Sequence, residues 1–382
     1  MNRNIINATH YKTDKPVSVE IENGHIARIS DSDKKSDLII APGLIDLQVN
    51  GYNGIDLNGS GLTTADIELL TYNICKDGVT SYFPTVITGS SHKIESLLRV
   101  IDSACKDLPF VNACIGGIHL EGPFISSDDG PRGAHPKEFV KAPDWDLFCR
   151  WQKAAGGRIR IITLSPEWPG SVEFIAKCTA NGVTVSIGHT AANPEQIRQA
   201  IEAGASMSTH LGNGSHLMMH RHANYIWQQL ASDHLWASVI ADGFHLPKAL
   251  LKVFLRAKQN KSILVSDATY FTGFAPGEYE SPIGGRVRLE ANGRLSMARN
   301  AELLAGSAKS LLCCVNYLVN QKIVSLSDAW DMASVRPMSL LMEKTMDGLQ
   351  VGERADLVLF EVIDNKILIK QTLKSGKYCR LL

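Results

Sequence analysis

Residues that can bind a metal ion or move a proton stand directly after short apolar runs in this sequence. Glu121, His189 and His210 each end such a run, and so do Asp242 and Asp267. One carboxylate and two imidazoles provide three ligands and leave an open position for water, which is the arrangement of a catalytic zinc site. A metal held in this way can activate water and polarise a carbonyl group. We therefore expect Glu121, His189 and His210 to bind one divalent metal ion.

Asp267 stands outside this ligand set and can serve as the proton carrier. A carboxylate beside an activated water accepts a proton as general base and returns it as general acid. Each histidine alone is weak evidence, because a single histidine after a strand is more often a hydrogen-bonded structural residue. Glu121 is stronger evidence, because an ionised carboxylate beside an apolar strand is costly unless it is paired or coordinated. Together these residues predict metal-dependent hydrolysis.

The apolar runs that carry these residues alternate with polar loops and stretches of helical spacing. Buried strands separated by helices indicate a parallel sheet, and eight strands favour closure into a (β/α)8 TIM-like barrel, with an open doubly wound sheet as the alternative. In a barrel the carboxyl ends of the strands meet at one mouth. The expected strands are residues 44–50, 81–87, 113–120, 159–164, 184–187, 205–209, 237–241 and 262–265.

The two ends of the chain have a different sequence pattern. Short runs with turns between them, at 17–21, 26–29 and 38–40 and again at 355–360 and 366–369, are typical of β-strands. We predict that both ends form one small β-sandwich domain, residues 1–43 plus 346–382, beside a catalytic barrel of residues 44–345.

Composition excludes several classes of protein. The chain of 382 residues has 39 Lys and Arg against 39 Asp and Glu, and no basic run suited to a phosphate backbone, so nucleic acid is not an expected partner. Nothing approaches the roughly 20 apolar residues that span a bilayer, and the first ten residues are too polar for a signal peptide, so we expect a cytoplasmic protein without a membrane partner. The eight cysteines lack a C-x-x-C pair and are expected to be small buried residues rather than a disulfide framework.

Several motifs in order resemble one known family over nearly the whole chain. They are Ala-Pro-Gly-Leu-Ile-Asp-Leu-Gln-Val-Asn-Gly at 41–51, His-Leu-Glu-Gly-Pro-Phe at 119–124, Gly-His-Thr at 188–190, Thr-His-Leu at 209–211, Ala-Asp-Gly-Phe-His at 241–245 and Ser-Asp-Ala at 266–268. Together they resemble the N-acetylglucosamine-6-phosphate deacetylase family of the amidohydrolase superfamily. The resemblance implies a distorted barrel with a small β domain, a homodimer, and hydrolysis of the N-acetyl amide of N-acetylglucosamine 6-phosphate to acetate and an amino sugar.

The resemblance also implies roles for single residues. It matches Glu121, His189 and His210 to the metal ligands, and Asp267 with His135 to the catalytic residues. Arg221 falls at the position of a phosphate-binding arginine. The implied substrate contacts are Ala134, His135, Asn213, Gly214, Arg221, Asp242, His245, Leu304, Ala305 and Gly306.

One position argues for a single metal ion. Many amidohydrolases have a His-x-His pair after the first strand, whereas this chain has Gln48 and Asn50 there. Neutral amides are poor zinc ligands, so we interpret this as a vestigial metal position. Zn²⁺ is the expected ion at the remaining site, and Fe²⁺, Co²⁺ or Mn²⁺ could use the same ligands.

The sequence departs from the family pattern after His210. The family has an aromatic residue and Asn-Ala-Met, then Arg-Glu-Pro-Gly; this chain has Gly-Asn-Gly-Ser at 212–215 and Arg-His-Ala-Asn at 221–224. One alternative is therefore an amidohydrolase for another N-acetylhexosamine, phosphorylated or not, or a cyclic amide. A second is an inactive barrel that binds a sugar phosphate, against which the intact ligand set argues.

The same segment contains three histidines. His216 and His220 would share one face if this segment were helical, and could then bind another metal. We favour a polar substrate-binding loop, because no carboxylate accompanies them.

Overall fold

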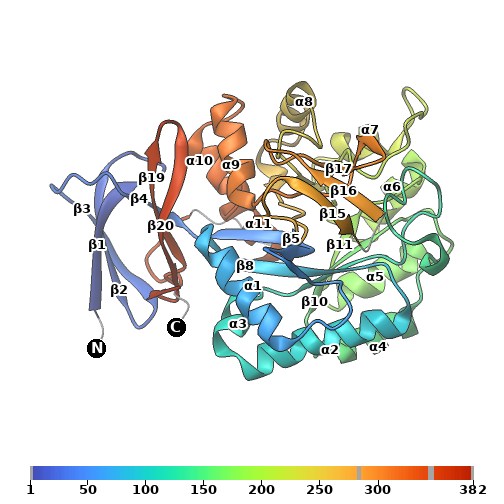
Figure 1. Cartoon of the computed structure of the whole chain (residues 1–382), viewed down its shortest axis with the longest axis horizontal. Helices are drawn as coiled ribbons and strands as arrows, with labels where there is room; N and C mark the ends of the chain where they lie inside the picture. Colours follow the sequence, from blue (N-terminus) through green and yellow to red (C-terminus); the bar gives the residue numbers. More distant parts are fainter. Residues whose placement is uncertain (1–2, 282–284, 343–347, 380–382) are drawn as a thin grey trace.

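The computed structural model describes residues 3–281, 285–342 and 348–379. Its centre is a sheet of eight parallel strands in the order β5-β8-β9-β10-β11-β12-β13-β14, surrounded by helices (Figure 1). The strands are β5 Leu44–Val49, β8 Val79–Ile87, β9 Ile118–Glu121, β10 Ile159–Leu164, β11 Thr184–Ile187, β12 Met207–Ser208, β13 Trp236–Val239 and β14 Ser262–Leu264. Their side chains are almost all buried, as expected for strands covered on both faces.

The sheet closes where the last strand meets the first. The backbone N–H of Asp267 donates to the carbonyl of Gln48 (3.1 Å), and the N–H of Asn50 donates to that of Ala268 (2.8 Å). Val49 and Ala268 form a parallel bridge at the same place. The predicted (β/α)8 barrel is confirmed, and this seam brings residues 48–50 beside residue 267.

The start of the third strand was predicted wrongly. Residues 113 and 114 belong to a helix, α3 Pro109–Cys114, and β9 begins only at Ile118. Proline is well suited to the first turn of a helix, and Val111 and Cys114, three residues apart, are the buried pair. The apolar run at 113–115 is therefore the last turn of a helix and the residue after it. A short apolar run does not by itself distinguish a buried strand from the end of a buried helix.

The helices pack around the barrel. None within the described ranges is long and apolar enough to cross a membrane. The α-helices are α1 Thr64–Lys76, α2 Ser91–Asp107, α3, α4 Trp145–Ala154, α5 Ser171–Ala180, α6 Pro194–Glu202, α7 Tyr225–Ala231, α8 Lys248–Lys258, α9 Leu311–Asn320, α10 Leu326–Met332 and α11 Val335–Met342, with 3₁₀ turns at Lys137–Phe139 and Gln259–Lys261.

Both ends of the chain form the small β domain, as predicted (Figure 1). Its single sheet has the order β21-β20-β19-β4-β1-β2-β3. The backbone of Ile26 pairs with Gly352 and Glu353, so the edge strand β3 curls back toward the chain that enters β19. The predicted boundary at 345/346 lies outside the described residues. The strands are β1 Arg3–His10, β2 Pro16–Glu22, β3 His25–Asp31, β4 Ile39–Pro42, β19 Leu357–Ile363, β20 Lys366–Lys374 and β21 Lys377–Tyr378.

An antiparallel sheet inserted after β14 was not predicted. Its strands are β15 Gly277–Ser281, β16 Gly285–Leu289, β17 Leu295–Met297 and β18 Asn300–Leu304. The alternating residues of β16 and β17 bury Val287, Leu289, Leu295 and Met297 against Phe271, and Asn292-Gly293 is a common turn between such runs. A short hairpin, β6 Gly51–Tyr52 with β7 Ile55–Asp56, follows β5.

Candidate metal centre

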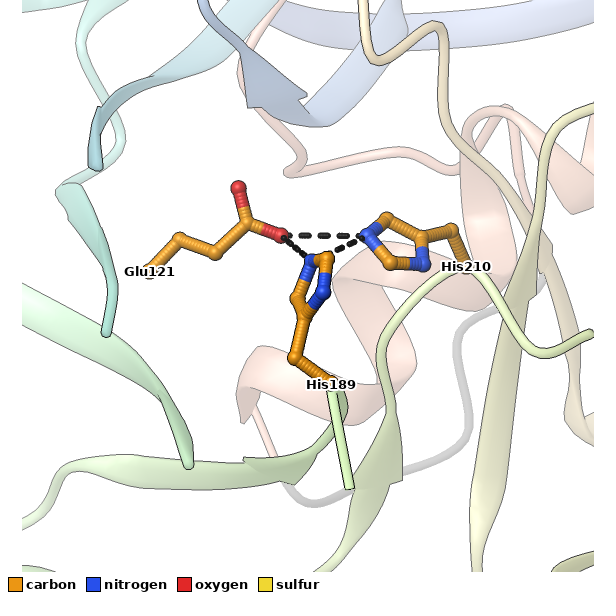
Figure 2. Close-up of side chains that lie close together, drawn as sticks. All are labelled: Glu121, His189 and His210. Carbon is orange, nitrogen blue, oxygen red and sulfur yellow. Dashed lines mark hydrogen bonds and ion pairs between the residues drawn. The ribbon is translucent and has the colours of Figure 1, made fainter. Parts of the chain in front are cut away.

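Three side chains meet at the carboxyl ends of the barrel strands β9, β11 and β12. Oε1 of Glu121 lies 3.1 Å from Nε2 of His189 and 3.1 Å from Nε2 of His210, and the two nitrogens are 3.1 Å apart (Figure 2). All three residues are buried. Among the described residues this is the one group of three whose ligand atoms converge closely enough to hold a metal ion.

The backbone is strained at the residues that follow the strands. His189, His210 and Asp267 have φ values of +48°, +26° and +49°, in a region that non-glycine residues rarely adopt. Such conformations cost of order 1–3 kcal/mol and are concentrated at functional sites, where packing holds them. Three of the four predicted residues are therefore held in conformations that the chain alone would not favour.

The donors fit a cation. Nδ1 of His189 lies 2.8 Å from the carbonyl oxygen of Pro131 and donates to it, which turns Nε2 toward Glu121 and leaves it as the nitrogen that can bind a metal ion. Burial would raise the pKa of Glu121, but the neighbouring His189 and His210 hold it well below its usual value. The buried negative charge of Glu121 therefore calls for a positive charge beside it, which a bound metal ion would supply.

The two amides at the vestigial position hold the two carboxylates. Nε2 of Gln48 donates to Glu121 (2.9 Å), and Nδ2 of Asn50 donates to Asp267 (2.6 Å). Within the described part of the chain, the amide oxygens of both residues are buried without a hydrogen-bond partner. Gln48 and Asn50 therefore orient the acids of the site rather than adding ligands.

Asp267 has the character of a proton carrier. Burial raises its pKa to about 6, while His210 and the hydrogen bond from Asn50 act in the opposite direction. A carboxyl group whose pKa approaches neutrality can both accept and return a proton.

His135 also lies at the centre. Its Nδ1 is 2.9 Å from the Thr88 hydroxyl, and its Nε2 is 3.3 Å from Nε2 of His189. Burial, together with the neighbouring His189, lowers the pKa of His135 to about 3, so the ring is neutral at physiological pH. The predicted catalytic histidine is thus in place.

A cleft of about 440 Å³ opens over these residues. Its walls include the predicted contacts Ala134, His135, Asn213, Gly214, His245, Leu304, Ala305 and Gly306. Sequence reasoning missed Asp56, Asn58, Tyr270, Met297 and Glu302, which also line it. Met297 and Glu302 belong to the unpredicted sheet, and Asp56 lies in the hairpin after β5, where no strand end marked it.

Two predicted substrate contacts lie elsewhere. Asp242 is not among the cleft-lining residues; its carboxylate accepts hydrogen bonds from the backbone of His245 and, at 2.7 Å, pairs with Nδ1 of that ring. Arg221 is exposed and is also absent from the walls of the described cleft. A larger cavity of about 730 Å³, lined by Arg160, Trp236 and other residues, opens at the amino ends of the strands, away from the metal ligands.

Known proteins are similar to this chain in sequence and in fold. No family model matches the chain. The N-acetylglucosamine-6-phosphate deacetylase of Bos taurus is 33% identical over 354 residues, covering 89% of this chain and 83% of the relative. The enzyme of the same name from Bacillus subtilis is 33% identical over 296 residues, covering 73% and 74%. This chain belongs to the N-acetylglucosamine-6-phosphate deacetylase family.

Solved structures agree on the fold. An N-acetylglucosamine-6-phosphate deacetylase from Pasteurella multocida has a TM-score of 0.86 at 24% identity, covering 99% of each chain. A mutant deacetylase from Mycobacterium smegmatis, in complex with N-acetyl-D-glucosamine-6-phosphate, has a TM-score of 0.85 at 22% identity, covering 98% of this chain and 99% of that one. A 5-methylcytosine deaminase from Klebsiella pneumoniae, with a TM-score of 0.60 at 11% identity, shares the fold over 99% of this chain and 97% of that one.

The structure explains where this deacetylase departs from the family pattern. Gly212 and Gly214 have φ values of +94° and +56°. A Cβ at 214 would lie 2.7 Å from Nδ1 of His189, and one at 212 would lie 3.0 Å from Leu246 and Phe254. The local backbone leaves no room for the aromatic and alanine side chains of the family pattern. Gly214 packs directly on the ring of His189.

The segment after Gly214 is not helical. Residues 216–222 contain no helix, so the premise that placed His216 and His220 on one helix face was wrong. His216 instead contacts the Tyr225 hydroxyl. Leu217 and Met218 are 99% and 89% exposed, and Arg221 belongs to the same exposed loop.

Proposed function

We propose that this protein hydrolyses the N-acetyl amide of N-acetylglucosamine 6-phosphate to glucosamine 6-phosphate and acetate. The observation that carries the proposal is the buried convergence of Glu121, His189 and His210 beside Asp267 at the barrel mouth. Curated relatives with this activity in their names support the choice of substrate.

The three ligands suit Zn²⁺, with Fe²⁺, Co²⁺ and Mn²⁺ as alternatives for the same donors. When bound, such an ion lowers the pKa of a water molecule and polarises the acetyl carbonyl. The charge of Glu121 and the fixed tautomer of His189 prepare the site for it.

The side chains of this chain move the proton and orient the substrate. Asp267, aimed by Asn50, takes a proton from the attacking water and gives it to the departing amine nitrogen. Because the Thr88 hydroxyl contacts Nδ1 of His135, the neutral ring can present its Nε2 lone pair to an N–H or hydroxyl group of the sugar. Asp242 holds the ring of His245 at the cleft wall.

The phosphate group of the substrate calls for a positively charged side chain. No Lys or Arg is found among the described residues that line the cleft. The exposed loop carries Leu217 and Met218 next to Arg221. We infer that the protein is a homodimer, in which this loop packs on a second copy and Arg221 completes the phosphate site there.

A substrate panel tests the reaction. N-acetylglucosamine 6-phosphate should be turned over far faster than unphosphorylated N-acetylglucosamine, other N-acetylhexosamines or cyclic amides. An Asp267→Asn variant should lose turnover and retain the metal, measured by elemental analysis, because Asp267 is outside the ligand set. Full activity in that variant, or turnover of another amide alone, would refute the proposal.

Mixing two inactive variants tests the dimer. Arg221→Ala and Asp267→Asn chains, unfolded and refolded together, should regain about a quarter of wild-type activity, because half of the dimers are mixed and each has one intact site. Loss of activity in both variants without recovery on mixing would place Arg221 in the site of its own chain or outside it.

A further inference from the structure

Three cysteines from distant parts of the chain meet where the small β domain packs on the barrel. Cys75 is in α1, Cys114 ends α3, and Cys379 follows β21. The side chain of Cys75 lies close enough to Cys114 and Cys379 for both to affect the pKa of its thiol. Cys75 and Cys114 are buried, whereas Cys379 is partly exposed. This cluster is separate from the metal centre and has no part in the proposed hydrolysis.

One threonine fixes the backbone of two of these cysteines. The hydroxyl of Thr372, on β20, donates to the carbonyl of Cys75 at 2.7 Å. The carbonyl of the same Thr372 accepts the backbone N–H of Cys379 at 2.9 Å. Cys75 and Cys379 are therefore neighbours across the interface between α1 and the small domain. Thr372 is itself buried, so this arrangement is part of the packed interface.

The two thiols differ in reactivity. The hydrogen bond from Cys75 and the charge of Lys374 lower the pKa of the Cys379 thiol. Hydrogen bonds to Cys114 and Cys379, together with burial, raise the pKa of the Cys75 thiol well above its usual value. A partly exposed thiol near a lysine is the kind that reacts first, and a protected neighbour can then resolve the product.

We propose that Cys379 and Cys75 form an oxidisable pair that exchanges with low-molecular-weight disulfides such as oxidised glutathione. The Cys379 thiolate attacks one glutathione sulfur, which forms a mixed disulfide and releases one glutathione thiolate. The Cys75 thiol then loses its proton, and its sulfur attacks the Cys379 sulfur and expels the second glutathione. Two protein thiols are oxidised to one disulfide while one glutathione disulfide is reduced to two thiols.

This disulfide would join α1 of the barrel to the end of the small domain. Such a link closes a loop from residue 75 to residue 379 and restricts the unfolded state. Oxidised protein should therefore unfold at a higher temperature than reduced protein, and a reducing agent should reverse the shift.

The experiment uses the purified full-length protein with oxidised glutathione. Intact mass should fall by two hydrogen atoms, and a non-reducing peptide map should show the Cys75 peptide linked to the Cys379 peptide. Cys379→Ser should abolish the mass loss, whereas Cys149→Ser, an exposed cysteine on α4, should leave it unchanged. The wild-type map identifies the partner even if Cys75→Ser fails to fold. A stable glutathione adduct, an unchanged mass or a link between other cysteines would overturn the proposal.

Discussion

Gln48 and Asn50 each hold one carboxylate of the site in place. Two histidines at these positions could bind a metal ion, whereas here two amides donate to Glu121 and Asp267. An amide cannot replace the charge of a second ion, but it can fix the direction of a carboxylate and lower its pKa. The candidate metal site therefore has side chains that orient both acids.

The pH dependence of the activity should reflect the ionisation of Asp267. This carboxyl must be ionised to accept a proton, and burial raises its pKa to about 6. Activity should therefore fall on the acid side of the pH profile, with a midpoint at or below about 6. The midpoint can lie below 6 because a bound cation lowers the pKa of Asp267 further. Asn50→Ala removes a hydrogen bond that lowers the pKa, so the limb of kcat against pH should move to higher pH.

Asn181→Ala is the matched control, because Asn181 is exposed and its side chain contacts only the carbonyl of Lys177. Its profile should superimpose on that of the wild type. An acid limb in Asn50→Ala that stays in place or moves to lower pH would contradict the role given to Asn50.

At the scale of elements, the seam between β5 and β14 contains a buried carboxyl group. Oδ1 of Asp46 accepts the backbone N–H of Ser266 at 3.1 Å, and burial raises its pKa to about 7 from 3.8. The folded protein thus binds this proton more tightly than the unfolded chain does. The resulting stability is present below the unfolded pKa and is lost as pH rises through about 7.

Asp46→Asn should remove this pH dependence. Asparagine keeps an oxygen to accept the N–H and carries no charge, so the variant should exceed the wild type in unfolding free energy at pH 8 by a few kcal/mol. The difference should shrink at pH 5, and Asp33→Asn on the surface should show neither effect. Thermal unfolding at both pH values measures this, and a larger gain at pH 5 would reverse the assignment.

The loop after β12 controls a metal ligand through one glycine. Gly214→Ala would place a Cβ 2.7 Å from Nδ1 of His189 and displace that ring. We expect the metal affinity to fall by roughly 10-fold or more. Gly182→Ala is the control, because Gly182 has φ +71° and no described atom within 4 Å of the added Cβ. Equal affinity in both variants, measured by competition with a chelator, would show that the contact is unimportant.

At the scale of the whole molecule, the metal site joins separate parts of the barrel. Its candidate ligands stand at the end of β9 and just after β11 and β12, so a bound ion would link segments that are far apart in the sequence. An ion that binds only the folded protein adds about 3 kcal/mol of stability at a concentration of about 100 Kd.

Removal of the metal should therefore lower the unfolding temperature. Dialysis against a chelator should shift the calorimetric midpoint of the wild type downward, and added Zn²⁺ should restore it. Asp267→Asn should show the same shift, whereas His210→Ala should show none because it lacks a ligand. A shift that persists in His210→Ala would mean that the stabilising ion binds elsewhere.

Local patterns were sufficient to predict much of this protein. An apolar strand followed by a polar residue is a pattern of consecutive residues, and so is the alternation of strands with helices. Both can be recognised in the sequence without the tertiary structure. For that reason the barrel, the small domain from both ends, and the positions of Glu121, His189, His210 and Asp267 could all be inferred. The order of the motifs along the chain also indicated the family. The alternating apolar residues at 287, 289, 295 and 297 also indicate strands, in the sheet after β14.

Only the tertiary structure decided which distant residues are partners. The contacts of Gln48 with Glu121, Asn50 with Asp267, and Gly214 with His189 exist because the barrel closes and strand ends converge. The exposure of Arg221 and the support that Asp242 gives to His245 have the same origin. Residue type and spacing determine what each side chain can do, but closed packing determines what it touches, and the burial and charge that set its chemistry follow from that contact.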